Sequence, residues 1–214
     1  MDRATEIAEL GVRAREAFEE KHRAREVTIA ASRKAIQCCA ASIRATHRRE
    51  FDAAETLARE AREHLAEVDA ALVEQPDVKQ NGPINDAKKE LCEAWLTLAL
   101  VRDERLPTPE DLNVEIAAYT NGMAEAASEL RRQLLDRLRA GELVEAERLM
   151  GSMDEVYSVL VTIDYPDGVT GGLRRTTDAL RAVLERTRGD LTTAMVAARL
   201  QGAIESAQRT TGAS

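Results

Sequence analysis

Apolar residues recur every three or four positions along most of this chain, which is the spacing that puts side chains on one face of an α-helix. Alternating runs of β-branched residues, which are typical of strands, are absent from the sequence. The pattern therefore predicts long helices, at about Arg3–Arg49, Phe51–Val73, Asn85–Val101, Val114–Arg139, Leu143–Ile163 and Leu173–Gln208.

Clusters of Pro, Gly and Asn interrupt this periodicity at three places. Gln75–Pro83 is predicted to be a loop. Between Pro107 and Pro109, Thr108 is a suitable cap for a short turn. The third cluster runs from Tyr165 to Gly172. We expect one all-α, single-domain multi-helix bundle with a long N-terminal helix over residues 1–210, and a frayed C-terminus at 211–214.

Composition agrees with a helical protein, since Ala, Leu, Glu and Arg dominate and aromatic residues make up 3% of 214 positions. A chain of this length can bury the core of one domain. Its cysteines, Cys38, Cys39 and Cys92, have no C-x-x-C spacing, and the histidines are not spaced as zinc ligands, which argues against a structural zinc site. With no secretion signal and no apolar run of membrane length, a cytoplasmic protein that does not enter membranes is expected.

Two pairs of glutamates lie within otherwise apolar helical stretches. Glu90 and Glu93 share one face of the third predicted helix, and Glu125 and Glu129 share one face of the fourth. A buried carboxylate is costly unless it is protonated, paired or bound to a metal, and hard oxygen ligands suit Mg²⁺ or Mn²⁺. The pattern therefore suggests a divalent-metal site. Ordinary glutamates on helix faces, which are common in a chain with 38 acidic residues, remain the alternative.

The net charge is −8, but basic residues are concentrated in one segment. Residues 21–50 hold eight Lys and Arg against two Glu, and residues 51–80 reverse this balance. On the first helix one face suits a phosphate backbone, with the candidates Arg33, Lys34, Gln37, Arg44, His47 and Arg48. Because aromatics are scarce, contacts to phosphate and 2′-hydroxyl groups are expected rather than base stacking. A solvated face paired with Glu60 and Glu63 explains the pattern equally well.

Several segments together resemble the translin superfamily, in particular KELCEAW, LPTPEDL, GMAEAASELRR and DYPDGVTGGLRRTTDALRAVLERTRGDLT. Their order and spacing extend over nearly the whole chain and are most similar to the archaeal translin-like proteins. The resemblance implies a translin-type helical fold and assembly into a hollow homo-octamer that encloses RNA. It also implies one of two activities, since translin binds RNA and single-stranded DNA, whereas translin-associated factor X is a Mg²⁺-dependent endoribonuclease.

In the catalytic branch, two helices carry four acidic residues. The resemblance assigns these positions to Glu90, Glu93, Glu125 and Glu129, with Glu125 standing where the branch has aspartate. The longer side chain moves the carboxylate by about an ångström, which affects rate more than chemistry. Translin itself lacks most of these acids, so the chain is expected to be nearer the nuclease branch.

The leading hypothesis is therefore an endoribonuclease that uses Mg²⁺ (or Mn²⁺), held by the four glutamates, to cleave short single-stranded RNA inside an oligomeric cage. Short duplex RNA and single-stranded DNA are further candidate ligands. Arg131 and Arg132 are expected near the scissile region, and His47 is expected to contact RNA rather than act as a general base. The alternatives are a non-catalytic RNA-binding cage, in which Lys88, Lys89 or arginines pair with the glutamates, and a structural assembly without nucleic acid.

Overall fold

The computed structural model describes residues 2–75, 78 and 82–212, and over these residues it contains helices and no strand. The long elements are α1 (Arg3–His47), α2 (Phe51–Glu74), α3 (Gly82–Arg102), α5 (Ile116–Arg139), α6 (Leu143–Leu160) and α8 (Leu173–Gly212). Two single turns, α4 (Pro109–Leu112) and α7 (Asp167–Thr170), lie in the connections. The predicted all-α class and the long N-terminal helix are thus confirmed.

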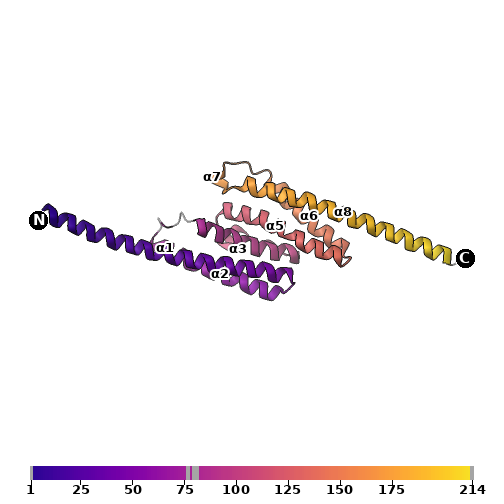
Figure 1. The fold of residues 1–214 in the computed structure, drawn as a ribbon, viewed down its shortest axis with the longest axis horizontal. Coiled ribbons are helices and arrows are strands. Elements are labelled where there is room, and N and C mark those ends of the chain that lie inside the picture. Colours follow the sequence, from indigo (N-terminus) through magenta and orange to yellow (C-terminus); the bar gives the residue numbers. More distant parts are fainter. Residues whose placement is uncertain (1, 76–77, 79–81, 213–214) are drawn as a thin grey trace.

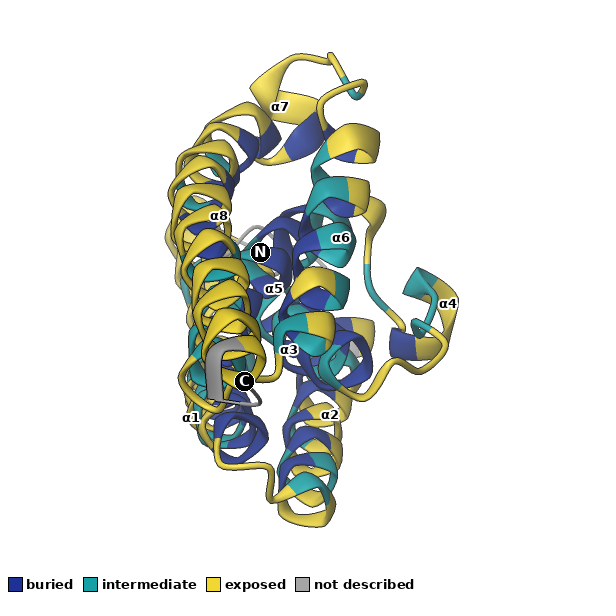
Figure 2. Ribbon diagram, turned by 90° about the vertical axis from the view of Figure 1, so that its right-hand side faces the viewer, coloured by how far each residue is buried: buried dark blue, intermediate teal, exposed yellow. Residues whose placement is uncertain are grey.

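The long helices form three layers of paired helices (Figure 1). α1 packs on α2, α3 packs on α5 in the middle layer, and α6 packs on α8. α3 also contacts α1, and α5 contacts both helices of the third layer, so the middle pair joins the bundle. Figure 2 shows that buried residues face the interior of this arrangement, while the outer faces are exposed.

Small residues set the spacing of the first layer. Ala35 and Cys39 of α1 and Ala54, Ala58 and Ala61 of α2 are fully buried. Without larger side chains between them, the two helices approach closely enough for the Ser42 hydroxyl to donate to the carbonyl of Ala54 at 2.7 Å. Larger side chains fill the rest of the core, among them Leu96, Leu130, Leu134, Leu149 and Met153.

Most element boundaries agree with the sequence pattern. α3 begins at Gly82, before the predicted start, because the fixed φ of Pro83 suits the first turn of a helix. The predicted cap at Thr108 is confirmed, since its hydroxyl accepts from the Asp111 amide at 3.1 Å and the Asp111 carboxylate accepts from the Thr108 amide at 2.9 Å. Most of the predicted loop Gln75–Pro83 lies outside the described residues.

The third predicted break contains one helical turn, α7, which ends at Gly171 in a left-handed conformation with φ of 64°. α6 ends at Leu160, before its predicted end at Ile163. α8 continues past the predicted end near Gln208 to Gly212. Residues 213–214 of the predicted C-terminal tail lie outside the described part of the chain.

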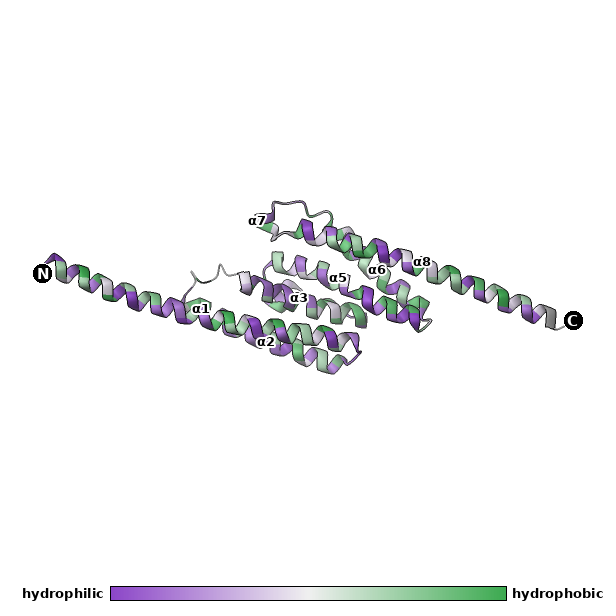
Figure 3. Ribbon diagram, in the orientation of Figure 1, coloured by the Kyte–Doolittle hydropathy of each residue, from purple (hydrophilic) through white to green (hydrophobic). Residues whose placement is uncertain are grey.

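Both long terminal helices extend beyond the bundle at opposite ends of the molecule (Figure 1). The buried positions of α1 begin at Thr28, so its N-terminal half is almost entirely exposed. Apolar residues nevertheless occur along both extensions (Figure 3), including Ile7, Leu10, Phe18, Val196, Leu200 and Ile204. Among the described residues, no helix is both long and apolar enough to cross a bilayer.

Candidate metal centre and nucleic-acid interface

The candidate site lies between α3 and α5, where the two helices approach closely at Gly122. A Cβ atom at Gly122 would lie 2.6 Å from the Cβ of Cys92 and 2.6 Å from the backbone oxygen of Lys89. These distances are shorter than van der Waals contact, so the crossing requires glycine at this position. One turn later on α5, Glu125 lies opposite the acidic pair of α3.

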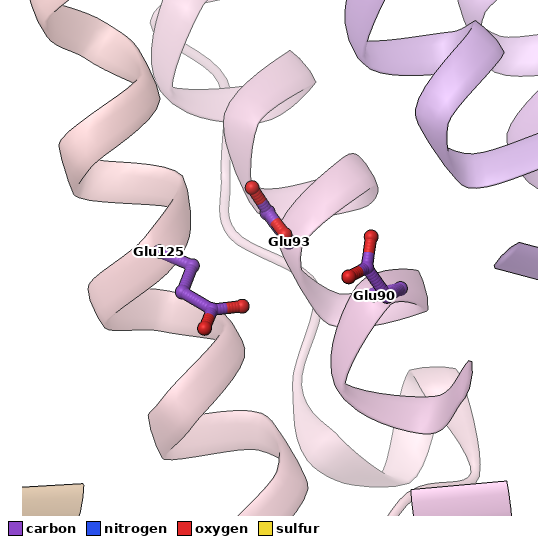
Figure 4. A group of neighbouring side chains, drawn as sticks. All are labelled: Glu90, Glu93 and Glu125. Carbon is purple, nitrogen blue, oxygen red and sulfur yellow. The ribbon is translucent and has the colours of Figure 1, made fainter. Parts of the chain in front are cut away.

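Glu90, Glu93 and Glu125 form a group in which one oxygen of each carboxylate lies within 4.8 Å of those of the other two. Figure 4 shows Glu125 of α5 extending towards α3, which carries Glu90 and Glu93. All three residues are at least partly buried. The structure therefore brings together three of the four predicted ligands, from two helices, as the sequence pattern suggested.

The fourth predicted ligand, Glu129, lies outside this group and is hydrogen-bonded to His47 of α1. Its Oε2 lies 2.6 Å from Nε2 of His47, and Nδ1 of that imidazole lies 3.2 Å from Nε2 of Gln133. The His47 side chain is 2% exposed. In this conformation His47 faces α5 instead of solvent, so it does not belong to the exposed basic face on which the sequence pattern placed it. Hydrogen bonds to Glu129 and Gln133, both on α5, hold the imidazole in this orientation.

Lys89 supplies the positive charge nearest the three carboxylates. Its Nζ lies 2.9 Å from Oε1 of Glu125, in a pair whose side chains are both about 30% exposed (28% and 31%). Lys88 points elsewhere, towards Asp69 at 3.5 Å and Glu115 at 3.3 Å. The pairing expected for a non-catalytic protein is thus present for Lys89 and Glu125, and Lys88 pairs outside the site.

Burial and mutual repulsion affect the ionisation of the cluster. Burial first, and then the charges of Glu90, Glu125 and Glu129, raise the pKa of Glu93 to about 8. Burial also raises the pKa of Glu90, although Lys89 opposes the shift. A site in which clustered carboxylates repel one another gains most from an added cation. The oxygen donors therefore fit a hard divalent ion such as Mg²⁺ or Mn²⁺.

The predicted basic face of α1 is exposed at Arg33, Lys34, Gln37 and Arg44. Arg48 is also exposed, but its guanidinium binds Glu50, with Nη2 at 2.6 Å from Oε2. Within the described residues, none of the cations on this face forms an ion pair with Glu60 or Glu63, so these acids do not neutralise it. The same helix packs on α3, which carries Glu90 and Glu93. The charges of these two glutamates add to the burial that raises the pKa of Cys39 on α1.

The two predicted arginines of α5 differ in their surroundings. Arg131 is bound to α8, with Nη2 at 2.7 Å from Oδ2 of Asp190 and Nη1 at 3.0 Å from the hydroxyl of Thr187. Arg132 is exposed. The structure therefore leaves Arg132 available at the surface, while Arg131 connects two helices.

Sequence reasoning did not assign a role to Gln133 or to the glycine at the helix crossing. Gly122 and Gln133 precede and follow the acidic pair of α5. A glycine amid alanines on a predicted helix is a signal for close packing. No comparable signal marks Gln133, because its partners His47 and Thr46 are more than 80 positions away in the sequence.

No family model matches the chain. An uncharacterized protein of Methanocaldococcus jannaschii is 32% identical over 113 residues, which cover 52% of this chain and half the length of that relative. Solved structures of AfC3PO, alone and in a complex with duplex RNA, are 35% identical and have a TM-score of 0.80, covering 86% of this chain and 96% of AfC3PO.

Apo-NeC3PO has the same fold, with a TM-score of 0.76 at 18% identity over 85% of this chain and 95% of that one. AfC3PO carries the argument for kinship, because its identity to this chain extends over nearly its whole length. The resemblance found in the sequence motifs is thereby confirmed, and this chain belongs to the translin superfamily.

Proposed function

We propose that this protein binds RNA and cleaves it as a Mg²⁺- or Mn²⁺-dependent endoribonuclease. The observation that carries the proposal is the group of three carboxylates, Glu90, Glu93 and Glu125, within 4.8 Å of one another on two crossing helices. Without a cation, the carboxylates of this group repel one another, and burial together with this repulsion raises the pKa of Glu93. The group therefore destabilises the metal-free protein, and a bound hard cation would relieve the repulsion.

In this proposal, Glu90, Glu93 and Glu125 hold the ion, with Glu129 beside them. A bound Mg²⁺ or Mn²⁺ supplies positive charge that stabilises a phosphoryl group during attack by water. To hold the ion, Glu93 must lose its proton to solvent and Glu125 must separate from Lys89, while exposed cations of the chain orient the RNA. No nucleophilic side chain is required.

Recognition of RNA is assigned to the exposed part of the basic face of α1. Arg33, Lys34 and Arg44 are exposed on α1, which packs on α3, the helix that carries Glu90 and Glu93. The duplex RNA in the complex of AfC3PO supports RNA as the ligand of this superfamily member. Short single-stranded RNA is the proposed substrate. Short duplex RNA and single-stranded DNA are proposed as further ligands, because all three have the phosphate groups that these cations would contact. Contacts to phosphate carry no sequence information, so little sequence preference is expected.

We further propose that the protein is a homo-oligomer, an octameric cage by analogy with its superfamily. The exposed accessible surface of the described chain is 12878 Å², whereas scaling with mass gives about 9,800 Å² for a compact monomer of 23.5 kDa. The extended terminal helices contribute to this large surface, and they expose apolar side chains such as Leu10, Phe18 and Leu200 in one copy.

The second candidate function is a non-catalytic RNA-binding protein of the translin type. The ion pair between Lys89 and Glu125 favours it, because a lysine amine occupies one predicted metal ligand. In that case the carboxylates are compensated from within the chain, and no cation is needed.

Cleavage of end-labelled RNA separates the two functions. Single-stranded and duplex RNA are incubated with the protein in Mg²⁺, Mn²⁺ or EDTA, and binding is read on a native gel. Glu93→Gln removes one carboxylate with little change in shape, and Glu155→Gln on the exposed face of α6 is the matched control. Metal-dependent cleavage that only Glu93→Gln abolishes supports the nuclease. Binding without cleavage supports the second candidate, and absence of binding contradicts both.

A further inference from the structure

His47, Gln133 and Glu129 form a partly buried chain of hydrogen bonds that joins the end of α1 to α5. His47 Nε2 lies 2.6 Å from Oε2 of Glu129, and its Nδ1 lies 3.2 Å from Nε2 of Gln133. The same amide nitrogen lies 3.3 Å from the backbone oxygen of Thr46. Gln133 is 2% exposed and the His47 side chain is 2% exposed, so water has little access to the hydrogen bond between these two side chains.

The contacts fix which nitrogen of the neutral imidazole carries the proton. The carbonyl of Thr46 can only accept, so the amide of Gln133 must present its nitrogen there, and that nitrogen donates. Turning the amide over would set two oxygens against each other. Nδ1 of His47, which faces the same NH₂ group, is consequently the acceptor, and Nε2–H donates to Glu129.

Glu129 needs this support, because its side chain is 37% exposed and can otherwise turn into solvent. It lies one turn beyond Glu125 on α5, and its charge raises the pKa of both Glu90 and Glu93. It is therefore close to the cluster without being one of the three carboxylates within 4.8 Å. The hydrogen bond engages Oε2 and leaves Oε1 for another partner.

We propose that His47 is a positioning residue for the metal centre: oriented by Gln133, it holds Glu129 by one oxygen so that the other faces the cation. This inference rests on the proposed function, because it assumes that the carboxylates bind a divalent ion. Hydrogen bonds from neighbouring groups that orient metal ligands commonly change metal affinity by 10- to 100-fold. His47 thus acts through Glu129 and does not itself contact the ion or the RNA.

Titration calorimetry with Mn²⁺ alone, on the full chain without RNA, tests the role apart from catalysis. His47→Ala is expected to raise the Kd for Mn²⁺ by about 10-fold. His47→Gln is expected to restore most of the affinity, because its amide nitrogen can donate to Glu129 from about the position of Nε2. His64→Ala removes a histidine that bonds only to Glu67 on α2, and is expected to leave the Kd unchanged.

Gln133→Leu supplies a second test that keeps the imidazole in place. Without the amide, Nδ1 can take the proton and the donor to Glu129 is lost, so a Kd raised about threefold or more is expected. Thermal denaturation of each variant shows whether it is folded. If His47→Ala does not fold, the Kd of Gln133→Leu decides the test.

Either folded variant with a Kd within twofold of the wild type overturns the positioning role, even if its melting temperature falls. A loss of affinity in His47→Ala that His47→Gln does not restore also overturns it, because the donor at Nε2 is then not what matters. If the wild-type protein binds no Mn²⁺, the metal centre itself is wrong. If Glu93→Gln abolishes binding and His47→Ala does not, only the positioning role fails.

Discussion

In the proposed metal centre, Lys89 and a divalent cation would compete for the same carboxylates. The Lys89 amine lies 2.9 Å from Glu125, and its charge lowers the pKa of both Glu90 and Glu93. Without a metal it is the cation nearest a group of acids that otherwise repel one another. A bound ion must displace it from Glu125, so the lysine both stabilises the metal-free protein and opposes loading.

Lys89→Met is predicted to separate these two effects. In EDTA the variant should melt at a lower temperature than the wild type, because the carboxylates lose their compensating charge. Saturating Mn²⁺ should then raise its melting temperature by more than it raises that of the wild type, since Glu125 is already free. Lys34→Met, which removes an exposed lysine of α1, should change neither value. Equal shifts with Mn²⁺ in both proteins would contradict the competition.

The raised pKa of Glu93 predicts a loss of stability with increasing pH in the metal-free protein. In the unfolded chain the carboxyl ionises near 4.5, but in the folded protein burial and its acidic neighbours keep the proton up to about 8. Between these values the folded state binds the extra proton, so the free energy of unfolding falls as pH rises through this window, and the loss is complete above about 8.

Glu93→Gln removes this titration and is predicted to flatten the pH profile. In EDTA its melting temperature should be close to that of the wild type near pH 5 and exceed it at pH 9 by about 10 °C. Differential scanning calorimetry across this range measures both curves. Glu155→Gln should follow the wild type throughout. Parallel curves for the wild type and Glu93→Gln would mean that Glu93 ionises normally in the folded protein.

Among the elements, the crossing of α3 and α5 depends on the glycine that allows it. Gly122→Ala places a Cβ 2.6 Å from Cys92 Cβ and from a backbone oxygen, so the helices must separate. Such overpacking costs about 1 to 3 kcal/mol, and it also moves Glu125 away from Glu93. Chemical denaturation should show the loss of stability, and Mn²⁺ titration should show weaker binding.

Gly151→Ala on α6 is the matched control for this change, because nothing lies within 4 Å of the position that the added methyl group would take. It should be neutral or more stable by about 0.5 to 1 kcal/mol, as alanine favours a helix interior more than glycine does. If Gly122→Ala were as well tolerated as Gly151→Ala, the close helix contact would not be needed to form the site.

α1 is the element expected to bind RNA, through Arg33, Lys34 and Arg44, which are exposed and form no ion pair within the described part of the chain. The double substitution Arg33→Glu/Arg44→Glu should weaken binding of single-stranded RNA and reduce the slope of log K against log salt by about 1.4. Filter binding at several salt concentrations measures both quantities. Arg105→Glu/Arg139→Glu, at two exposed positions away from α1, is the control. An unchanged slope would remove the basic face from the binding surface.

The helices and the acidic pairs could be predicted from sequence because both depend on spacing within one element. Three-residue and four-residue intervals suffice to place Glu90 with Glu93, and Glu125 with Glu129. The same rule misplaced His47, which shares a helical face with Arg44 but turns to α5 in the structure. Its burial, the contact with Gln133 and the pairing of Lys89 depend on how α1, α3 and α5 pack, which no local pattern specifies.

At the scale of the whole molecule, the extended ends of α1 and α8 carry large apolar side chains that are exposed in one copy. On α1, Ile7, Leu10 and Phe18 lie on one face at helical spacing, and this face continues the one that is buried from Thr28 onward. Leu10 is 63% exposed and Phe18 is 72% exposed. An apolar face that is buried along half of a helix and bare along the other half fits contact with a further copy.

Leu10→Glu/Phe18→Glu is therefore predicted to reduce the number of subunits measured by multi-angle light scattering, because each charge would have to be buried in the interface. Val73→Glu/Val144→Glu introduces the same charges at two positions that are each 83% exposed and lie on no such stripe, and it should leave the mass unchanged. A wild-type monomer at micromolar concentration would contradict the oligomer directly. RNA affinity of both double variants is measured as well. If Leu10→Glu/Phe18→Glu lowers both the mass and the RNA affinity, and the control lowers neither, RNA binding requires the oligomer. The cations of one copy would then be too few to hold the RNA.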